Sequence, residues 1–294
     1  MSKSISLVLG SGGARGLAHI GVIRCLEEHG FEIRCIAGSS MGALIGGIYA
    51  AGKLDVYEQW VRELQRRDII RLLDWSFSRG AILAGDKIIN VLEEMIGKYL
   101  IEDLSISFTA VATEINDHRE VWLSRGSLFE AIRASIAMPL VFAPVRRDDM
   151  LLVDGGLVNP VPIAPTLTDT TNFTVAVDVN GRAERLSEPD RKSEASAESS
   201  GTIRNRISRF IENLTGNAAQ SDDDYPSPIE LGLNSLDAMQ TQIARFKMAA
   251  YAPGLIVQIP RNLCTIFEFH RASELIQFGH ERAQQALEYL EDGN

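Results

Sequence analysis

Cysteines, long apolar runs and a leader segment are scarce or missing in this sequence. The three cysteines, Cys25, Cys35 and Cys264, are odd in number and have no metal-ligand spacing, which favours free thiols in a reducing compartment. No stretch approaches the roughly 18 consecutive apolar residues of a membrane span. The first residues lack the charged, apolar and small-residue regions of a signal peptide. These absences together predict a cytoplasmic protein.

Positive charge is also in deficit. The 294 residues include 29 Lys and Arg against 39 Asp and Glu, which gives a formal net charge of −10. This balance disfavours nucleic acid as a partner and a strong attraction of the whole molecule to anionic membranes. Local basic patches still allow a transient contact with the inner membrane surface. Because no cluster of His, Cys and Asp has ligand spacing, we expect neither a metal nor an organic cofactor.

The first half of the chain alternates short apolar segments with helical patterns. Residues 5–9 and 33–37 are expected strands, and each is followed by a glycine-rich turn and a helix, over 17–28 and 43–50. This order is typical of an α/β protein with a mainly parallel central sheet and helices on its faces. The further expected strands are 108–114, 121–123, 151–153, 173–179 and 255–259. Residues 55–100 are expected to be largely helical, and the further helices are 127–137, 229–251 and 273–290.

Composition divides the chain into three parts. Residues 5–180 are expected to form the core. Residues 181–228 are rich in Ser, Glu, Asp, Arg and Asn, which predicts a flexible polar insertion. Residues 229–294 are expected to form a helix, a strand and a helix that complete the same domain. The oligomeric state is left open.

A G-x-S-x-G motif, Gly38 to Gly42, lies between an expected strand and a helix. A nucleophilic serine at Ser40 needs a tight turn that projects its hydroxyl clear of the backbone, and the flanking Gly38 and Gly42 remove side chains that would clash. The start of the following helix favours developing negative charge. Taken alone, the motif is also consistent with a turn whose serine caps the helix.

A glycine-rich segment from Gly10 to Gly16 follows the first expected strand. Its backbone N–H groups can converge on an anion or an oxyanion. A dinucleotide-binding loop is similar, but it requires glycine where Arg15 stands and an acid at the end of the second strand. A nucleotide-dependent oxidoreductase is therefore disfavoured. For Arg15 itself, steering of an anionic head group and a structural salt bridge are both open.

The third motif is Asp154-Gly155-Gly156, after the expected strand 151–153. A carboxylate here can approach a neighbouring loop, although an ordinary Asp-Gly turn has the same sequence. The carboxyl ends of the strands in a parallel sheet share one edge, where ligands bind. We therefore expect the three motifs to meet at that edge.

In this order, the motifs resemble those of the bacterial patatin-like phospholipases, over about residues 5–167. The family's G-x-G-x-x-[G/R], G-x-S-x-G and D-G-[A/G] motifs match Gly10–Arg15, Gly38–Gly42 and Asp154–Gly156. The segment 134–139, Ala-Ser-Ile-Ala-Met-Pro, is also similar. The resemblance implies a three-layer α/β/α fold and a hydrolase of phospholipid or other acyl-ester lipids.

The resemblance further implies a catalytic dyad, in which Ser40 attacks the ester carbonyl and Asp154 accepts its proton. Backbone N–H groups of Gly12, Gly13 and Ala14 would hold the oxyanion. An ordinary Asp, with a pKa of about 3.9, is a poor base for an alcohol. The dyad therefore requires a dry site that raises the pKa of the carboxyl group.

The histidines provide an internal check on this dyad. A triad of the α/β-hydrolase type runs Ser, acid, His, and only His270 and His280 follow Asp154. Both lie in the mostly helical C-terminal region, which disfavours a triad, and His19 is more consistent with packing. Phospholipase, lysophospholipase, thioesterase and acyltransferase activities, and a catalytically silent regulatory protein, remain open.

Overall fold

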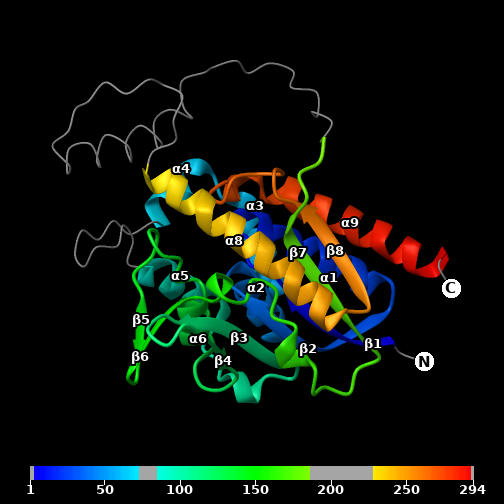
Figure 1. Cartoon of the computed structure of the whole chain (residues 1–294), viewed down its shortest axis with the longest axis horizontal. Helices are drawn as coiled ribbons and strands as arrows, with labels where there is room; N and C mark the ends of the chain where they lie inside the picture. Colours follow the sequence, from blue (N-terminus) through cyan, green and yellow to red (C-terminus); the bar gives the residue numbers. More distant parts are fainter. Residues whose placement is uncertain (1–2, 73–84, 186–227, 293–294) are drawn as a thin grey trace. The chain divides into compact units, whose positions relative to one another are not determined.

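The computed structural model describes residues 3–72, 85–185 and 228–292. Within these residues, eight strands form one sheet in the order β5-β6-β3-β2-β1-β7-β8, with β4 paired to β3 (Figure 1). The neighbouring strands β3, β2, β1, β7 and β8 run parallel to one another. β4 and β6 pair antiparallel with β3, and β5 pairs antiparallel with β6. The strands are β1 Lys3–Leu9, β2 Phe31–Ser39, β3 Ser107–Glu114, β4 Arg119–Leu123, β5 Val145–Arg147, β6 Met150–Asp154, β7 Phe173–Gly181 and β8 Leu255–Pro260.

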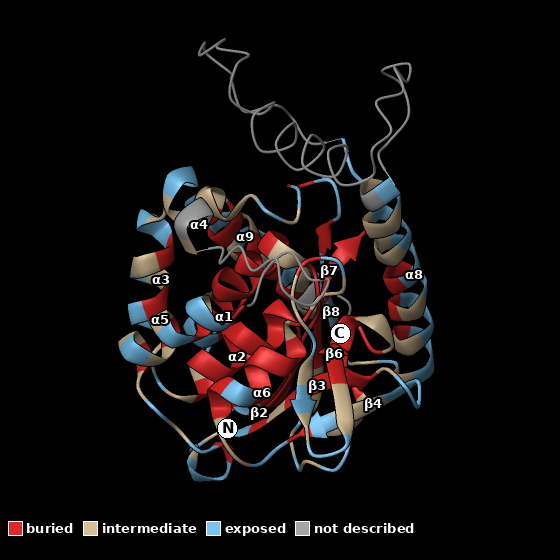
Figure 2. Cartoon of the chain, turned by 90° about the vertical axis from the view of Figure 1, so that its left-hand side faces the viewer, coloured by how far each residue is buried: buried red, intermediate tan, exposed pale blue. Residues whose placement is uncertain are grey.

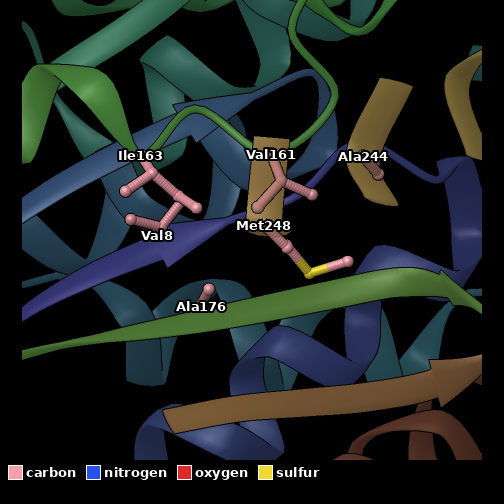
Figure 3. Close-up of a cluster of buried hydrophobic side chains, with 6 residues drawn as sticks. All are labelled: Val8, Val161, Ile163, Ala176, Ala244 and Met248. Atoms are coloured by element: carbon pink, nitrogen blue, oxygen red, sulfur yellow. The ribbon is translucent and has the colours of Figure 1, made fainter. Parts of the chain in front are cut away.

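Helices cover both faces of this sheet, which confirms the predicted α/β fold. On β1, Val8 belongs to a buried apolar cluster that includes Ala244 and Met248 of α8 (Figure 3). The next residue, Leu9, lies against α2, where a Cβ atom on Gly46 would touch it. Successive strand residues point to opposite faces, so α8 and α2 lie on opposite sides of β1. The helices are α1 Ala18–Glu28, α2 Met41–Ala50, α3 Leu54–Glu63, α4 Arg66–Leu72, α5 Asp86–Ile96, α6 Leu128–Ser135, α8 Pro228–Tyr251 and α9 Ala272–Asp292.

The buried core lies between the central strands and the helices next to them. β1 and α2 are buried along most of their length, whereas α3, α5 and α8 each have an exposed outer face (Figure 2). α2 is almost entirely apolar, as its sequence MGALIGGIYA requires for a helix enclosed on all sides. The site-bearing turns are therefore anchored to the rigid centre of the fold.

The backbones of the C-terminal helix α9 and of helix α1 pack directly against each other. A Cβ atom on Gly279 would overlap the carbonyl group of Ala18, and one on Gly21 would overlap the carbonyl group of Ile276. Glycine on each helix removes the side chain that would keep the two backbones apart. This contact fixes α1, which directly follows the glycine-rich segment.

The secondary structure differs in detail from the expectations. The helix predicted over 127–137 ends at Ser135, because Pro139 cannot continue it and Met138 N–H turns to the carbonyl of Ile136. The described residues of the span 55–100, which was expected to be helical, form α3, α4 and α5. The short strand β5, Val145–Arg147, was missed because it has only three residues and two of them are arginines.

The chain divides into two compact units, one of residues 1–184 and 237–294 and the other of residues 185–236. The expected core, 5–180, lies within the first unit. The polar insertion expected over 181–228 falls outside the described residues except at its two ends, so its flexibility stays a prediction. No helix in the described part of the chain is both long and apolar enough to span a bilayer.

Candidate active site

Ser40 occupies a sharp turn between β2 and α2. Its backbone has φ 55° and ψ −122°, a conformation that non-glycine residues rarely adopt. A Cβ atom on Gly38 would overlap the carbonyl of Gly42, and one on Gly42 would overlap the carbonyl of Leu9 on β1. Both motif glycines are thus needed for the chain to turn this tightly against the sheet.

The hydroxyl of Ser40 and the carboxyl group of Asp154 are in direct contact. Ser40 Oγ donates to Asp154 Oδ2 at 2.5 Å, and the Gly156 N–H donates to Asp154 Oδ1 at 2.7 Å. Asp154 is fully buried and Ser40 is 8% exposed. Burial raises the pKa of Asp154 to about 6, although both hydrogen bonds act to lower it. This carboxyl group is therefore a stronger base than an ordinary aspartate.

Asp154 reaches the site by a different path from the one that the sequence predicted. It ends β6, which pairs antiparallel with β3, so that Asp154 lies opposite Ala112. On the same edge of β3, the preceding residue Val111 is in register with Ser39 of the parallel strand β2, whereas β4 occupies the other edge. The expectation that Asp154 follows a parallel strand was wrong. β6 instead runs back from the far end of β3 and stops level with Ser40.

The two glycines after Asp154 allow close packing around its carboxyl group. A Cβ atom on Gly155 would overlap the carbonyl of Val111, and one on Gly156 would lie 2.5 Å from Ser11 Oγ and 2.9 Å from Asp154 Oδ1. Ser11 belongs to the glycine-rich segment. The Asp-Gly-Gly turn therefore links the dyad residue to that segment.

The glycine-rich segment also lies against the turn that contains Ser40. It continues from β1 into a 3₁₀ turn, Gly13–Leu17, and a Cβ atom on Gly16 would lie 2.5 Å from Met41 Cβ, next to Ser40. Gly10 N–H donates to Val177 O, and the Ser11 N–H donates to Pro160 O. These bonds hold the entrance of the segment to its neighbours.

The three expected oxyanion donors differ in their hydrogen bonding. The Ala14 N–H donates to Ile266 O at 3.0 Å. Among the described residues, no acceptor pairs with the N–H of Gly12 or Gly13. The available donors in this segment are therefore Gly12 and Gly13.

Arg15 holds the glycine-rich segment to distant parts of the chain. Its guanidinium donates to Asn180 Oδ1 and Asp237 Oδ1, both at 2.7 Å, and to the carbonyl of Arg261 at 3.1 Å. The Arg15 side chain is 5% exposed. Of the two roles open from the sequence, this geometry is that of a structural salt bridge.

In the described part of the chain, His19, His270 and His280 form hydrogen bonds to groups other than Ser40 and Asp154. His19 is fully buried and shares a hydrogen bond with Gly10 O, and burial lowers its pKa to about 4. His270 accepts from Arg66, and His280 pairs with Glu28. In the part of the chain that the structure describes, no group of three or more His, Cys, Asp and Glu side chains could hold a metal ion.

Two further contacts at the dyad were missed by sequence reasoning. The Ser135 hydroxyl accepts a hydrogen bond from the Ser40 N–H, and the Ala137 carbonyl accepts one from the Asp154 N–H. The segment 134–139 was recognised as similar to the family, but no role followed from its sequence. Its partners lie too far away along the chain to leave a local pattern.

Comparison with known proteins agrees with this fold. A model of the patatin-like phospholipase family matches residues 7–167, more than half of the chain. The chain belongs to the patatin-like phospholipase family. This membership supports a lipid acyl hydrolase at the level of the family.

Relatives of the chain extend beyond the matched segment. NTE family proteins of Mycobacterium bovis and Mycobacterium tuberculosis are 39% identical over 99% of this chain and 93% of theirs. Lysophospholipase NTE1 of Pyricularia oryzae is 27% identical over 99% of this chain, which corresponds to 19% of that protein. The solved structure of VipD from Legionella pneumophila has a TM-score of 0.44 at 14% identity, covering 98% of this chain and 67% of that one. At that level the VipD match says nothing about function.

Proposed function

We propose that the chain hydrolyses the carboxylic ester bonds of phospholipids or related acyl lipids through a Ser40–Asp154 dyad. The observation that carries this proposal is the 2.5 Å hydrogen bond from the Ser40 hydroxyl to a fully buried carboxyl group. Family membership supports the lipid substrate. The positions of His270 and His280, which bond to Arg66 and Glu28, favour a dyad over a triad.

Acylation begins with proton transfer along the Ser40–Asp154 hydrogen bond. Asp154 Oδ2 accepts the proton as Ser40 Oγ attacks the ester carbonyl carbon. The same Asp154 then donates that proton to the leaving alcohol oxygen, which leaves the acyl group on Ser40. A pKa of about 6 suits both steps near neutral pH, because the carboxyl group is ionised at rest and still accepts a proton readily.

The negative charge on the carbonyl oxygen requires hydrogen-bond donors. The N–H groups of Gly12 and Gly13, which have no acceptor within the described residues, are the candidates. Ala14 is excluded from our proposal because its N–H already donates to Ile266 O. Removal of one such donor typically costs on the order of 10²–10³ in rate. The rigid attachment of this segment therefore matters as much as its glycine content.

Deacylation repeats the chemistry with water. Asp154 removes a proton from the attacking water and returns it to Ser40 Oγ, which releases a fatty acid. Transfer to an alcohol or a thiol would give an ester or a thioester instead. Product analysis therefore separates a hydrolase from an acyltransferase.

The test is hydrolysis of p-nitrophenyl esters of short and long acyl chains, followed by product analysis with phospholipid vesicles. Ser40→Ala and Asp154→Asn are each expected to lose about 10³-fold or more in kcat while staying folded. A His270→Ala/His280→Ala double variant is the matched control and is expected to keep its activity. An inactive but folded double variant would overturn the dyad, and an inert wild type would overturn the hydrolase itself.

A further inference from the structure

The strained backbone of Ser40 requires a fixed support. At φ 55° a non-glycine residue persists only where its surroundings over-determine the conformation. The turn is followed by α2, whose first N–H groups have no partners within the helix. Something outside the turn must therefore hold the peptide group that precedes Ser40 Cα.

Ser135 provides this support through one buried hydroxyl. The Ser40 N–H donates to Ser135 Oγ at 2.9 Å, and Ser135 Oγ donates in turn to the carbonyl of Val111 on β3 at 2.6 Å. Ser135 is fully buried at the last residue of α6. Its hydroxyl is thus used once as an acceptor and once as a donor, which fixes its position as well as that of Ser40.

The same short segment also holds the other member of the dyad. Two residues beyond Ser135, the Ala137 carbonyl accepts the Asp154 N–H at 3.0 Å. The Thr113 hydroxyl on β3 donates to the carbonyl of Asp154 at 2.9 Å. The end of α6 and strand β3 therefore set the distance between Ser40 Oγ and Asp154 Oδ2.

We propose that Ser135 is a positioning residue for the reaction. It holds the turn at Ser40 so that Ser40 Oγ stays hydrogen-bonded to Asp154 Oδ2. This inference rests on the proposed function. It also has a consequence for the oxyanion: the Ser40 N–H is consumed by Ser135 and is not a donor to substrate. The oxyanion would then be stabilised by other N–H groups, such as those of Gly12 and Gly13.

The experiment compares Ser135→Ala with Ser135→Thr, which keeps a hydroxyl, and with Ser6→Ala. Ser6 is the matched control because it is also fully buried in the sheet and shares a hydrogen bond with Thr171 Oγ1 at 2.8 Å. We expect Ser135→Ala to lower kcat about tenfold or more and to change KM by less than about twofold, because misplaced reacting groups affect turnover rather than binding. Ser135→Thr should recover most of kcat, and Ser6→Ala should keep it.

A readout independent of turnover is hydrogen exchange at the Ser40 amide, followed by NMR. Exchange should accelerate in Ser135→Ala and stay slow in Ser6→Ala. Unchanged kcat and unchanged exchange in a folded Ser135→Ala would overturn the inference and leave the proposed function standing. Equal losses of kcat in Ser135→Ala and Ser6→Ala would also overturn it. If the wild type neither hydrolyses esters nor is labelled at Ser40 by a fluorophosphonate, the proposed function fails and this inference fails with it.

Discussion

The segment matched to the family and the C-terminal segment 237–292 contribute to the site in different ways. The first holds Ser40 and Asp154 in direct contact. The second holds neither residue, yet its Asp237 and the carbonyl groups of Arg261 and Ile266 bind the glycine-rich segment. Under the proposed function, the first region supplies the chemistry, and the second fixes the loop that would stabilise the charge.

The two regions also differ in what their buried polar groups cost. Asp154 is a buried carboxyl group whose raised pKa reflects an unfavourable environment for its charge. Asp237, by contrast, neutralises the buried guanidinium of Arg15 and is itself one-third exposed. Under the proposed function, the region that holds Asp154 loses stability to keep a basic carboxylate, while the Asp237 carboxylate offsets part of the cost of burying the Arg15 charge.

The largest expected effect on stability comes from the contact between α1 and α9, which tests whether the C-terminal segment holds the fold together. Gly279→Ala would place a Cβ atom on the Ala18 carbonyl and force the helices apart. Although alanine is favoured over glycine in a helix by about 1 kcal/mol, we expect a net loss of about 2–3 kcal/mol in the free energy of unfolding. Chemical denaturation measures this, with Gln277→Ala on the exposed side of α9 as the control. A Gly279→Ala protein as stable as the control would show that α9 does not hold α1 closely.

The Arg15–Asp237 pair tests whether the C-terminal segment affects catalysis without touching the dyad. Asp237→Ala leaves the Arg15 guanidinium, with a side chain 5% exposed, without its carboxylate. We expect a loss of about 2 kcal/mol in stability, below the range for fully buried pairs because Asp237 is partly exposed. We also expect kcat to fall about tenfold as the oxyanion donors lose their fixed position.

The control for Asp237→Ala is Asp55→Ala. Asp55 pairs with Arg24 at the surface and its side chain is 88% exposed. Exposed pairs of this kind contribute about 0–1 kcal/mol, so stability and kcat should stay close to those of the wild type. Equal effects in the two variants would mean that Arg15 and Asp237 play no special part in the site.

The sequence predicted that Ser40 and Asp154 would meet better than it predicted the way they are held. Ser40 and the strand-turn-helix around it follow from local spacing, because both motif glycines act within five residues of one another. Asp154 was placed next to Ser40 for the wrong reason, since β6 runs antiparallel to β3. Antiparallel pairing through a short, half-polar hairpin leaves little trace in apolar periodicity.

The supporting contacts could not be predicted because their partners are far apart in sequence. Ser40 and Ser135 are 95 residues apart, and Arg15 and Asp237 are 222 residues apart. A serine at a helix end or an arginine in a glycine-rich loop has many possible partners until the fold selects one. A single sequence carries no signal that links such positions.

The pH dependence of the reaction tests whether burial makes Asp154 a stronger base than an ordinary aspartate. Because Asp154 must be ionised to accept the serine proton, kcat/KM should fall about tenfold per pH unit below a pKa of about 6 and level off above it. Product release measured by chromatography at each pH gives the profile. The same acid limb should remain in the His270→Ala/His280→Ala variant, since these histidines bond to Arg66 and Glu28 rather than to Ser40 or Asp154. A limb near the pKa of an ordinary Asp would contradict the effect of burial.

The last expected effect concerns stability, and its sign is informative. The folded-state pKa of Asp154, about 6, is raised above the ordinary value of 3.8. A group raised in this way contributes stability below its unfolded pKa and loses it as pH rises through the folded pKa. The wild type should therefore lose about 2 kcal/mol between pH 4 and pH 7 at this residue, and Asp154→Asn, which does not titrate, should not.

Denaturation of the wild type and Asp154→Asn at several pH values measures this difference directly. Asn keeps an oxygen for the Gly156 N–H and an amide group that can donate to Ser40 Oγ, so its packing is conserved. We expect the inactive Asn variant to gain stability relative to the wild type as pH rises from 4 to 7. A constant difference across that range would mean that the Asp154 carboxylate is not destabilised by burial. The region that holds Asp154 would then not be destabilised by the charge of that residue.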